Sequence, residues 1–211
     1  MQLSKRSAVA EVAVGFVLIE ATVWSSRPVQ RYWFWAAASW FLLCTILAVR
    51  RQGCEFHFRL PRFEATAMLF CAPVFFAGVL LAHTGAVNTA HRQFGIVTPL
   101  FHASAYLFWA VVQQYLQQAF FFARLEHATA NGVLAGFLTA SLFALAHIPN
   151  PVLTPVTFAG GWFLSELFRR YRSIVPLGIL HGLTGMAIAL TVPDHLLHHM
   201  RVGLSYLTYP H

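Results

Sequence analysis

The sequence predicts an all-α fold, a polytopic transmembrane bundle of about seven helices. The first observation is composition: 58% of the 211 residues are hydrophobic and only 10% are charged, against roughly 25% charged in soluble domains. The second is a series of apolar runs of roughly 17–25 residues, the length that crosses a bilayer. The third is the distribution of positive charge. If the runs alternate across a membrane, 10 of the 14 Lys and Arg residues share one side.

The seven predicted spans follow one another with short loops and form one domain, residues 1–211. They cover residues 8–24, 32–49, 65–82, 100–125, 132–148, 152–168 and 174–192. The first is predicted to be a retained helix rather than a signal peptide, because Glu11 interrupts its apolar region and no clear small-residue cleavage site precedes Arg27. The Asn150-Pro151 step separates the fifth and sixth spans. We expect Pro155 to interrupt the short sixth span.

The positive-charge bias predicts a cytoplasmic amino terminus. We expect an integral protein of a bacterial inner (plasma) membrane, with the lipid bilayer as one partner. The net charge of +7 fits anionic lipid headgroups. No nucleic acid is expected as a partner, because no RNA-binding motif and no basic stripe with interleaved aromatics occurs outside the loops.

Polar residues stand inside three of the apolar runs. The fourth span contains Gln113, Gln114, Gln117 and Gln118, the fifth contains His147, and the seventh contains His181. An unsatisfied polar group in hydrocarbon costs several kcal/mol, so these side chains should face protein or a wet cavity. We predict that they converge on one intramembrane site within residues 100–190.

The order of these residues resembles the CPBP family (CAAX-processing and bacteriocin-processing, also called Abi) of intramembrane proteases. That family carries EExxxR, then FxxxH, then HxxxN. Phe143 and His147 match the second motif, and His181 matches the histidine of the third, whose asparagine position is Gly185 here.

The first motif matches in polarity and spacing but not in residue type. Gln113 and Gln114 stand at its two glutamates, and Gln118 stands at its arginine. A rival register puts Arg124 on the arginine. It is rejected because the glutamate positions would then hold Ala119 and Phe120.

The resemblance implies a site in which water is activated to cleave a peptide bond. It implies catalytic roles for Gln113, Gln114, His147 and His181, and we assign substrate binding to Gln117, Gln118 and Phe143. A glutamine amide cannot take a proton, whereas an imidazole titrates near neutral pH. One of the two histidines is therefore the expected base. No cofactor is expected. A metal held by the two histidines is an alternative without a strong ligand spacing behind it.

Three functions follow from these observations. The first is an intramembrane endopeptidase that cleaves a membrane-associated peptide or protein. The second is a catalytically inactive relative, a pseudoprotease that binds a peptide or partner helix in the same cavity. The third, a small transporter, lacks the internal repeat that many transporter folds show. In the predicted topology, His147 lies near the external end of its span and His181 nearer the cytoplasmic side. They can meet only if the fifth span stops short or the seventh is long or tilted.

Overall fold

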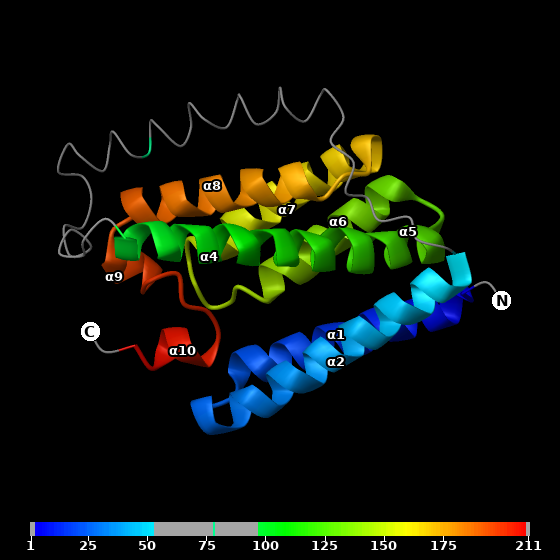
Figure 1. Cartoon of the computed structure of the whole chain (residues 1–211), viewed down its shortest axis with the longest axis horizontal. Coiled ribbons are helices and arrows are strands. Elements are labelled where there is room, and N and C mark those ends of the chain that lie inside the picture. Colours follow the sequence, from blue (N-terminus) through cyan, green and yellow to red (C-terminus); the bar gives the residue numbers. More distant parts are fainter. Residues whose placement is uncertain (1–2, 53–77, 79–96, 210–211) are drawn as a thin grey trace.

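A computed structural model describes residues 3–52, 78 and 97–209 of the chain (Figure 1). Among these residues every regular element is a helix, so the predicted all-α class is confirmed. The span predicted over residues 65–82 lies outside the described residues, apart from position 78. The number of spans therefore stays a prediction.

The helices follow the predicted apolar runs closely. In chain order they are α1 (Lys5–Trp24), α2 (Arg27–Gln52), α4 (Val97–Gln114), the π-helix η3 (Tyr115–Phe122), α5 (Ala123–Thr129), α6 (Gly132–Leu145), α7 (Leu153–Tyr171), α8 (Val175–Thr191), α9 (Asp194–Leu197) and α10 (Leu204–Leu207). The predicted fourth span is thus a continuous series of α4, η3 and α5. Its glutamines lie where the backbone changes from α-helix to the wider π-helix, a form that often marks functional sites.

The α1–α2 hairpin lies beside the remaining helices and crosses them obliquely in Figure 1. Both of its helices are long and apolar enough to cross a membrane, whereas α6 and α8 are shorter apolar helices. The hairpin is joined to the bundle at one end, where Arg124 of α5 contacts Glu11 of α1 at 2.6 Å and donates to Phe120 O. The Arg124 guanidinium also stacks on the Phe120 ring.

Close packing against α4 fixes the position of α8. A Cβ added at Gly178 would lie 2.6 Å from Val111, and one added at Gly182 would lie 2.6 Å from Leu107. No side chain fits at these distances, so glycine lets the two backbones approach, as small residues do between membrane helices. This contact holds the His181 turn of α8 against the glutamine end of α4.

The expected interruption of the sixth span at Pro155 is wrong. Helix α7 is continuous from Leu153 to Tyr171, and Pro155 lies in its first turn. Proline is tolerated there because the first backbone N–H groups of a helix have no intrahelical partner. The break that the sequence contains is the turn over residues 146–152, between α6 and α7.

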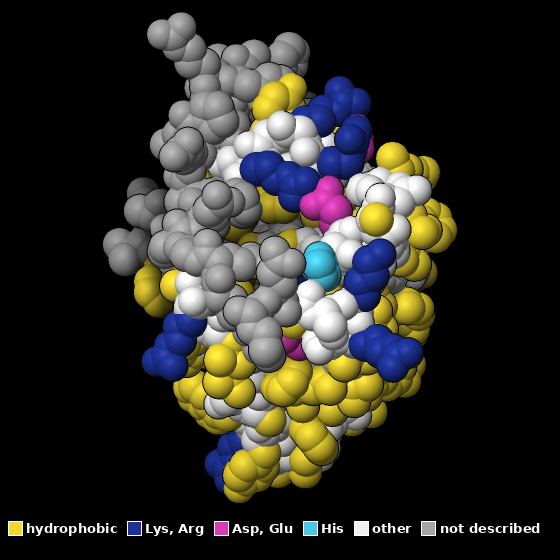
Figure 2. Space-filling model, turned by 90° about the vertical axis from the view of Figure 1, so that its right-hand side faces the viewer, with side chains coloured by type: hydrophobic (Ala, Val, Ile, Leu, Met, Phe, Trp, Pro, Cys, Tyr) yellow, Lys and Arg dark blue, Asp and Glu magenta, His cyan; other side chains and the backbone are white. Residues whose placement is uncertain are grey.

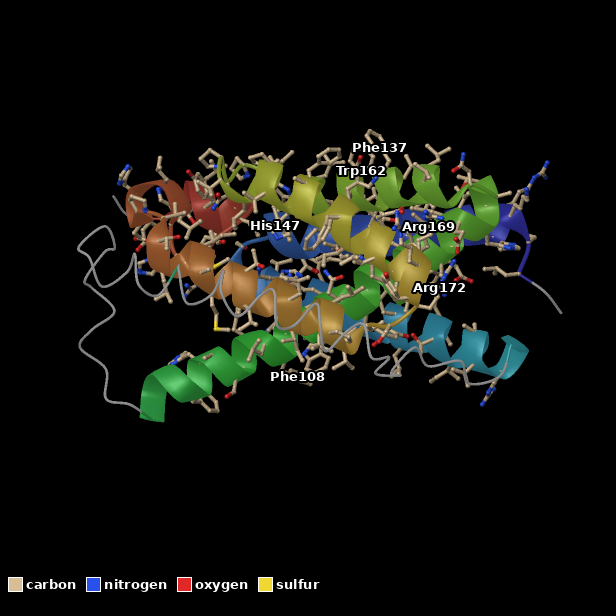
Figure 3. The ribbon with its side chains drawn as sticks, turned by 90° about the horizontal axis from the view of Figure 1, so that it is seen from above. Phe108, Phe137, His147, Trp162, Arg169 and Arg172 are labelled. Atoms are coloured by element: carbon tan, nitrogen blue, oxygen red, sulfur yellow. The ribbon has the colours of Figure 1, made fainter. Side chains whose placement is uncertain are left out.

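Large apolar side chains cover the outside of the bundle. Phe108 is 71% exposed, and Phe137 and Trp162 are more than 40% exposed. Figure 3 shows these three at the outer edges of the bundle, whereas His147 lies among the helices. An exposed surface this rich in apolar side chains fits contact with lipid.

Charged side chains gather at one end of the bundle, which Figure 2 views directly. Glu166 pairs with Arg169 and Arg170, and Glu126 pairs with Arg172 at 2.7 Å. The amino terminus lies at the same end (Figure 1). Residues predicted to share one side of the membrane therefore lie together, and the assignment of that side to the cytoplasm stays a prediction.

Candidate active site

Three of the four glutamines form one buried hydrogen-bonded network. Gln114, Gln117 and Gln118 are at most 2% exposed. Gln117 Nε2 donates to Gly161 O at 3.2 Å, and Gln114 Nε2 donates to Gln117 Oε1 at 2.7 Å. Gln118 Nε2 donates to Gln114 Oε1 at 3.2 Å. The network links η3 to α7 and satisfies most of the buried amide groups, as burial in an apolar bundle requires.

The Gly161 carbonyl fixes the orientation of this network. A carbonyl oxygen only accepts, so the amide atom of Gln117 that faces it must be nitrogen. The Gln117 oxygen then faces Gln114, and the Gln114 atom in contact with it must be nitrogen as well. The same Gln114 nitrogen lies 3.0 Å from His181 Nδ1. Its second hydrogen points to the histidine.

His181 is thereby held in one tautomer. Because Gln114 donates to Nδ1, that nitrogen must carry the lone pair, and the proton of the neutral imidazole lies on Nε2. The Nε2–H group of His181 is a hydrogen-bond donor. Among the described residues it has no protein acceptor.

His147 is held in the opposite tautomer. It lies in the turn that follows α6, and its Nδ1 lies 2.6 Å from Phe143 O one turn earlier. A carbonyl requires a donor, so Nδ1 carries the proton and the lone pair lies on Nε2. The two histidines of the site therefore present a proton acceptor and a proton donor.

Asn150 holds the turn that carries His147. Its Oδ1 accepts from the backbone N–H groups of Val152 and Leu153, and its Nδ2 donates to the carbonyls of Leu197 and Arg201 at 3.0 Å each. The side chain is fully buried. It therefore caps the start of α7 and fastens the carboxyl-terminal segment to the turn. The sequence signal for this role is an asparagine just before a helix.

Side chains of three predicted spans meet at one cavity of about 870 Å³. Gln113, Gln117, Phe143, His147 and His181 all line it. The Phe143 ring contacts both imidazoles, with centroids 4.7 Å from His147 and 5.6 Å from His181. The expected convergence is thus present in the structure.

The structure also separates the glutamines into two pairs. Gln113 and Gln117 face the cavity, whereas Gln114 and Gln118 are completely buried behind its wall. Gln114 can act on the cavity only through its contacts with His181 and Gln117. The catalytic and substrate-binding roles assigned to these residues stay predictions.

The length of α6 explains how the two histidines meet. With 14 residues and a rise of 1.5 Å per residue, α6 is about 21 Å long, shorter than a hydrocarbon core of about 30 Å. Helix α6 is therefore too short to cross the hydrocarbon core alone. The turn that follows it brings His147 toward Phe143 and His181.

Two features bear on the chemistry. No carboxylate lines the cavity in the described part of the chain. In residues 3–52 and 97–209 no group of three or more His, Cys, Asp or Glu side chains is placed to hold a metal ion, and the expectation about cofactors stays untested. Arg124 of the rival register pairs with Glu11 and does not line the cavity.

The family model described as type II CAAX prenyl endopeptidase Rce1-like matches residues 5–187. The chain belongs to this family. The resemblance predicted from the three motifs is therefore confirmed, and the match extends over the first helices, which carry no motif. No curated protein and no solved structure matches the chain.

Membership of the Rce1-like family indicates an intramembrane protease of the CAAX type. It agrees with the apolar helices and the lipid-type surface, so this Rce1-like chain is an integral membrane protein. The family also implies a membrane-associated protein or peptide as substrate.

Proposed function

We propose that this Rce1-like chain hydrolyses a peptide bond of a prenylated, membrane-anchored protein, with His147 as the general base. The observation that carries the proposal is the pair of opposite tautomers around Phe143. His147 Nε2 offers a lone pair and His181 Nε2 offers a proton. A base beside a fixed donor is the minimum that hydrolysis of an amide needs.

The reaction would proceed in two steps. In the first, His147 Nε2 takes a proton from water while the water oxygen adds to the carbonyl carbon, and the carbonyl oxygen becomes an oxyanion. The Nε2–H group of His181 donates to that oxyanion. In the second, the carbon–nitrogen bond breaks, the carbonyl forms again, and the proton on His147 passes to the leaving nitrogen.

The glutamine amides would assist the reaction by orienting His181 and the water, because an amide carries no charge. Gln114 holds His181 Nδ1 as an acceptor, so the His181 ring stays neutral with its donor toward the cavity. Gln113 lines the same cavity and has no hydrogen bond to another described residue. Its amide is free to orient the water or to donate to the oxyanion.

The cavity wall supports a substrate with a long apolar group. Away from the histidines it consists largely of aromatic and aliphatic side chains from the hairpin and from η3, including Phe16, Phe41, Leu116 and Phe121. Burying an apolar chain there would yield about 0.8 kcal/mol per CH₂ group. A mainly apolar wall does not resemble the polar path of a transporter.

The test is cleavage by purified protein in lipid vesicles. The substrate is a farnesylated peptide ending in a CAAX sequence, and the product is identified by mass spectrometry. Wild-type protein is expected to release the terminal tripeptide, and His147→Ala is expected to be inactive. The same peptide without the farnesyl group serves as the control for prenyl dependence.

A second candidate function is a pseudoprotease that binds the peptide and leaves it intact. The absence of a carboxylate from the described cavity lining favours it, because the family motif has glutamates where Gln113 and Gln114 stand. Peptide that stays intact with wild-type protein, but binds with a dissociation constant that His147→Ala raises, would establish this function instead.

A further inference from the structure

The hydroxyl of Tyr106 occupies the space in front of Gly185. Tyr106 lies on α4 and Gly185 on α8, one turn after His181. A Cβ added at Gly185 would lie 2.0 Å from the Tyr106 hydroxyl oxygen and 2.9 Å from its Cζ. A side chain at residue 185 would therefore require the Tyr106 ring to move. Position 185 is the one where the HxxxN pattern has asparagine.

Tyr106 also belongs to the cavity wall. Tyr106 and Gly185 both line it, together with His181 and Thr184. Side chains four residues apart on a helix lie about 6 Å apart, so the space beside Gly185 is about one turn from the base of the His181 side chain. Within residues 3–52 and 97–209 the Tyr106 hydroxyl makes no hydrogen bond, so its proton remains available to a molecule in the cavity.

A packing role alone does not account for this hydroxyl. The aromatic ring already fills the space against α8, and phenylalanine would fill it equally. A tyrosine O–H inside an apolar bundle normally has a partner, because an unpaired one loses its hydrogen bond to water. A partner that arrives with the substrate satisfies this requirement.

We infer that Tyr106 is a further catalytic residue of the reaction proposed above, on which this inference rests. Its hydroxyl donates a hydrogen bond to the substrate carbonyl oxygen as that oxygen becomes an oxyanion. It shares this role with the Nε2–H group of His181. No proton is transferred from Tyr106, so the balance of the hydrolysis is unchanged: water adds, and the carbon–nitrogen bond breaks. Glycine at position 185 is what makes room for the tyrosine.

The test compares Tyr106→Phe with wild-type protein on the farnesylated CAAX peptide in vesicles. Removing one oxyanion donor lowers kcat about 100-fold in known cases, and we expect a loss of that order with KM within about threefold. The thermal unfolding midpoint should not change, because the ring remains. Tyr32→Phe removes an exposed tyrosine hydroxyl outside the cavity and should leave kcat unchanged.

A rescue experiment distinguishes hydrogen-bond donation by the Tyr106 hydroxyl from packing by the Tyr106 ring. Tyr106→Ala should be as slow as Tyr106→Phe. Adding Gly185→Asn to Tyr106→Ala places an amide donor in the vacated space. The double variant should have a kcat at least about tenfold above that of Tyr106→Ala. Gly185→Asn alone should lower kcat, because the asparagine forces the Tyr106 ring out of its place.

The outcomes distinguish this inference from the proposed function. If Tyr106→Phe cleaves at the wild-type rate while His147→Ala is inactive, the role of Tyr106 is overturned and the protease function stands. If Gly185→Asn gives no rescue in the Tyr106→Ala protein, donation from this position is overturned. If the wild-type protein leaves the peptide intact, both proposals fall together.

Discussion

The Gln114 side chain donates a hydrogen bond to Nδ1 of His181 at 3.0 Å, from a position that is completely buried behind the cavity wall. In the predicted motif register, Gln114 stands where the family motif has its second glutamate. A carboxylate in the same place would accept a hydrogen bond from His181 Nδ1–H, whereas the amide donates a hydrogen bond to Nδ1. The substitution therefore reverses the direction of this hydrogen bond, and with it the tautomer of the histidine.

This relationship gives opposite expectations for two neighbouring substitutions. Gln114→Glu replaces the donor to Gln117 Oε1 by an acceptor, so that two acceptors face each other there. It also draws the proton of His181 to Nδ1, away from the cavity. Such a mismatch costs about 1–3 kcal/mol, so we expect activity about tenfold or more below wild type. Gln113→Glu places a carboxylate in the cavity, where it can serve as a second base, and should preserve or raise activity.

Initial rates of peptide cleavage by the two variants provide the measurement, and their thermal unfolding midpoints provide the control for folding. Equal activity of the two glutamate variants would show that the amide orientation of Gln114 does not matter. Loss of activity in Gln113→Glu with normal folding would show that the cavity tolerates no carboxylate.

The sequence was sufficient to predict most of the described helices and the meeting of Phe143, His147 and His181 at one cavity. Apolar runs of membrane length define α1, α2, α6, α7 and α8, and the polar residues within such runs had to face protein. It could not show which glutamines face the cavity. Gln113 and Gln114 are neighbours in one apolar run, and which of them faces the cavity depends on how the last turn of α4 is rotated against α8.

Gly161 gives a second test of the amide network, because its carbonyl sets the orientation. A Cβ at Gly161 would lie 2.8 Å from Gln117 Nε2, so Gly161→Ala should push the Gln117 amide off the carbonyl and loosen the tautomer of His181. We expect cleavage to fall about tenfold, equivalent to about 1.4 kcal/mol in the barrier.

The matched control for this change is the neighbouring glycine. A Cβ at Gly160 meets nothing within 4 Å, so Gly160→Ala should keep cleavage within about twofold of wild type. The rates of both variants are measured on the same peptide. Similar losses in both would point to the helix backbone of α7 rather than to the network.

Asn150 should couple the His147 turn to the carboxyl-terminal segment. Asn150→Asp keeps the acceptor for Val152 and Leu153 but loses both donors to the tail carbonyls. We expect a loss of about 3 kcal/mol in unfolding free energy and at least about tenfold faster trypsin cleavage after Arg201. Limited proteolysis in detergent followed by mass spectrometry measures the second effect.

Asn131→Ala is the matched control, because Asn131 caps α6 through Val133 and Leu134 without touching the tail. It should cost about 1 kcal/mol and leave cleavage after Arg201 unchanged. An Asn150→Asp protein with wild-type resistance at Arg201 would contradict the role of Asn150 as a tail clamp.

Asp194 should make stability depend on pH at the carboxyl-terminal end. Burial raises the pKa of its carboxyl, but hydrogen bonds from the side chain and backbone of His199 outweigh this and hold the pKa below its ordinary value. A carboxyl with a lowered folded pKa contributes stability above its unfolded pKa of about 3.9, and this is lost as the pH falls through the folded pKa.

The expected result is a difference between wild type and Asp194→Asn that is full at neutral pH and closes below about pH 4. Thermal unfolding midpoints between pH 7 and 3 measure it. Tyr209→Phe removes a weaker contact at 3.2 Å and should shift the curve less. A difference that does not vary with pH would assign the contribution of Asp194 to packing.

The contact between Tyr106 and Gly185 could not be predicted from the sequence. Tyr106 belongs to no motif, and in the sequence Gly185 is only a missing asparagine. The contact between them forms only when α4 packs closely against α8. The Tyr106 side chain then fills the space beside Gly185. Contacts of this kind depend on tertiary packing that no local pattern encodes.

The most direct test of the proposed hydrolysis is the source of the oxygen in the new carboxyl group. Wild-type protein in lipid vesicles is incubated with farnesylated CAAX peptide in water enriched in ¹⁸O, and the new carboxyl group is analysed by mass spectrometry. Hydrolysis by water with His147 as the base should place one ¹⁸O atom in the product per cleaved bond in a single turnover, and His147→Ala should give no product. Intact peptide bound to wild-type protein, or cleavage that persists in His147→Ala, would contradict it.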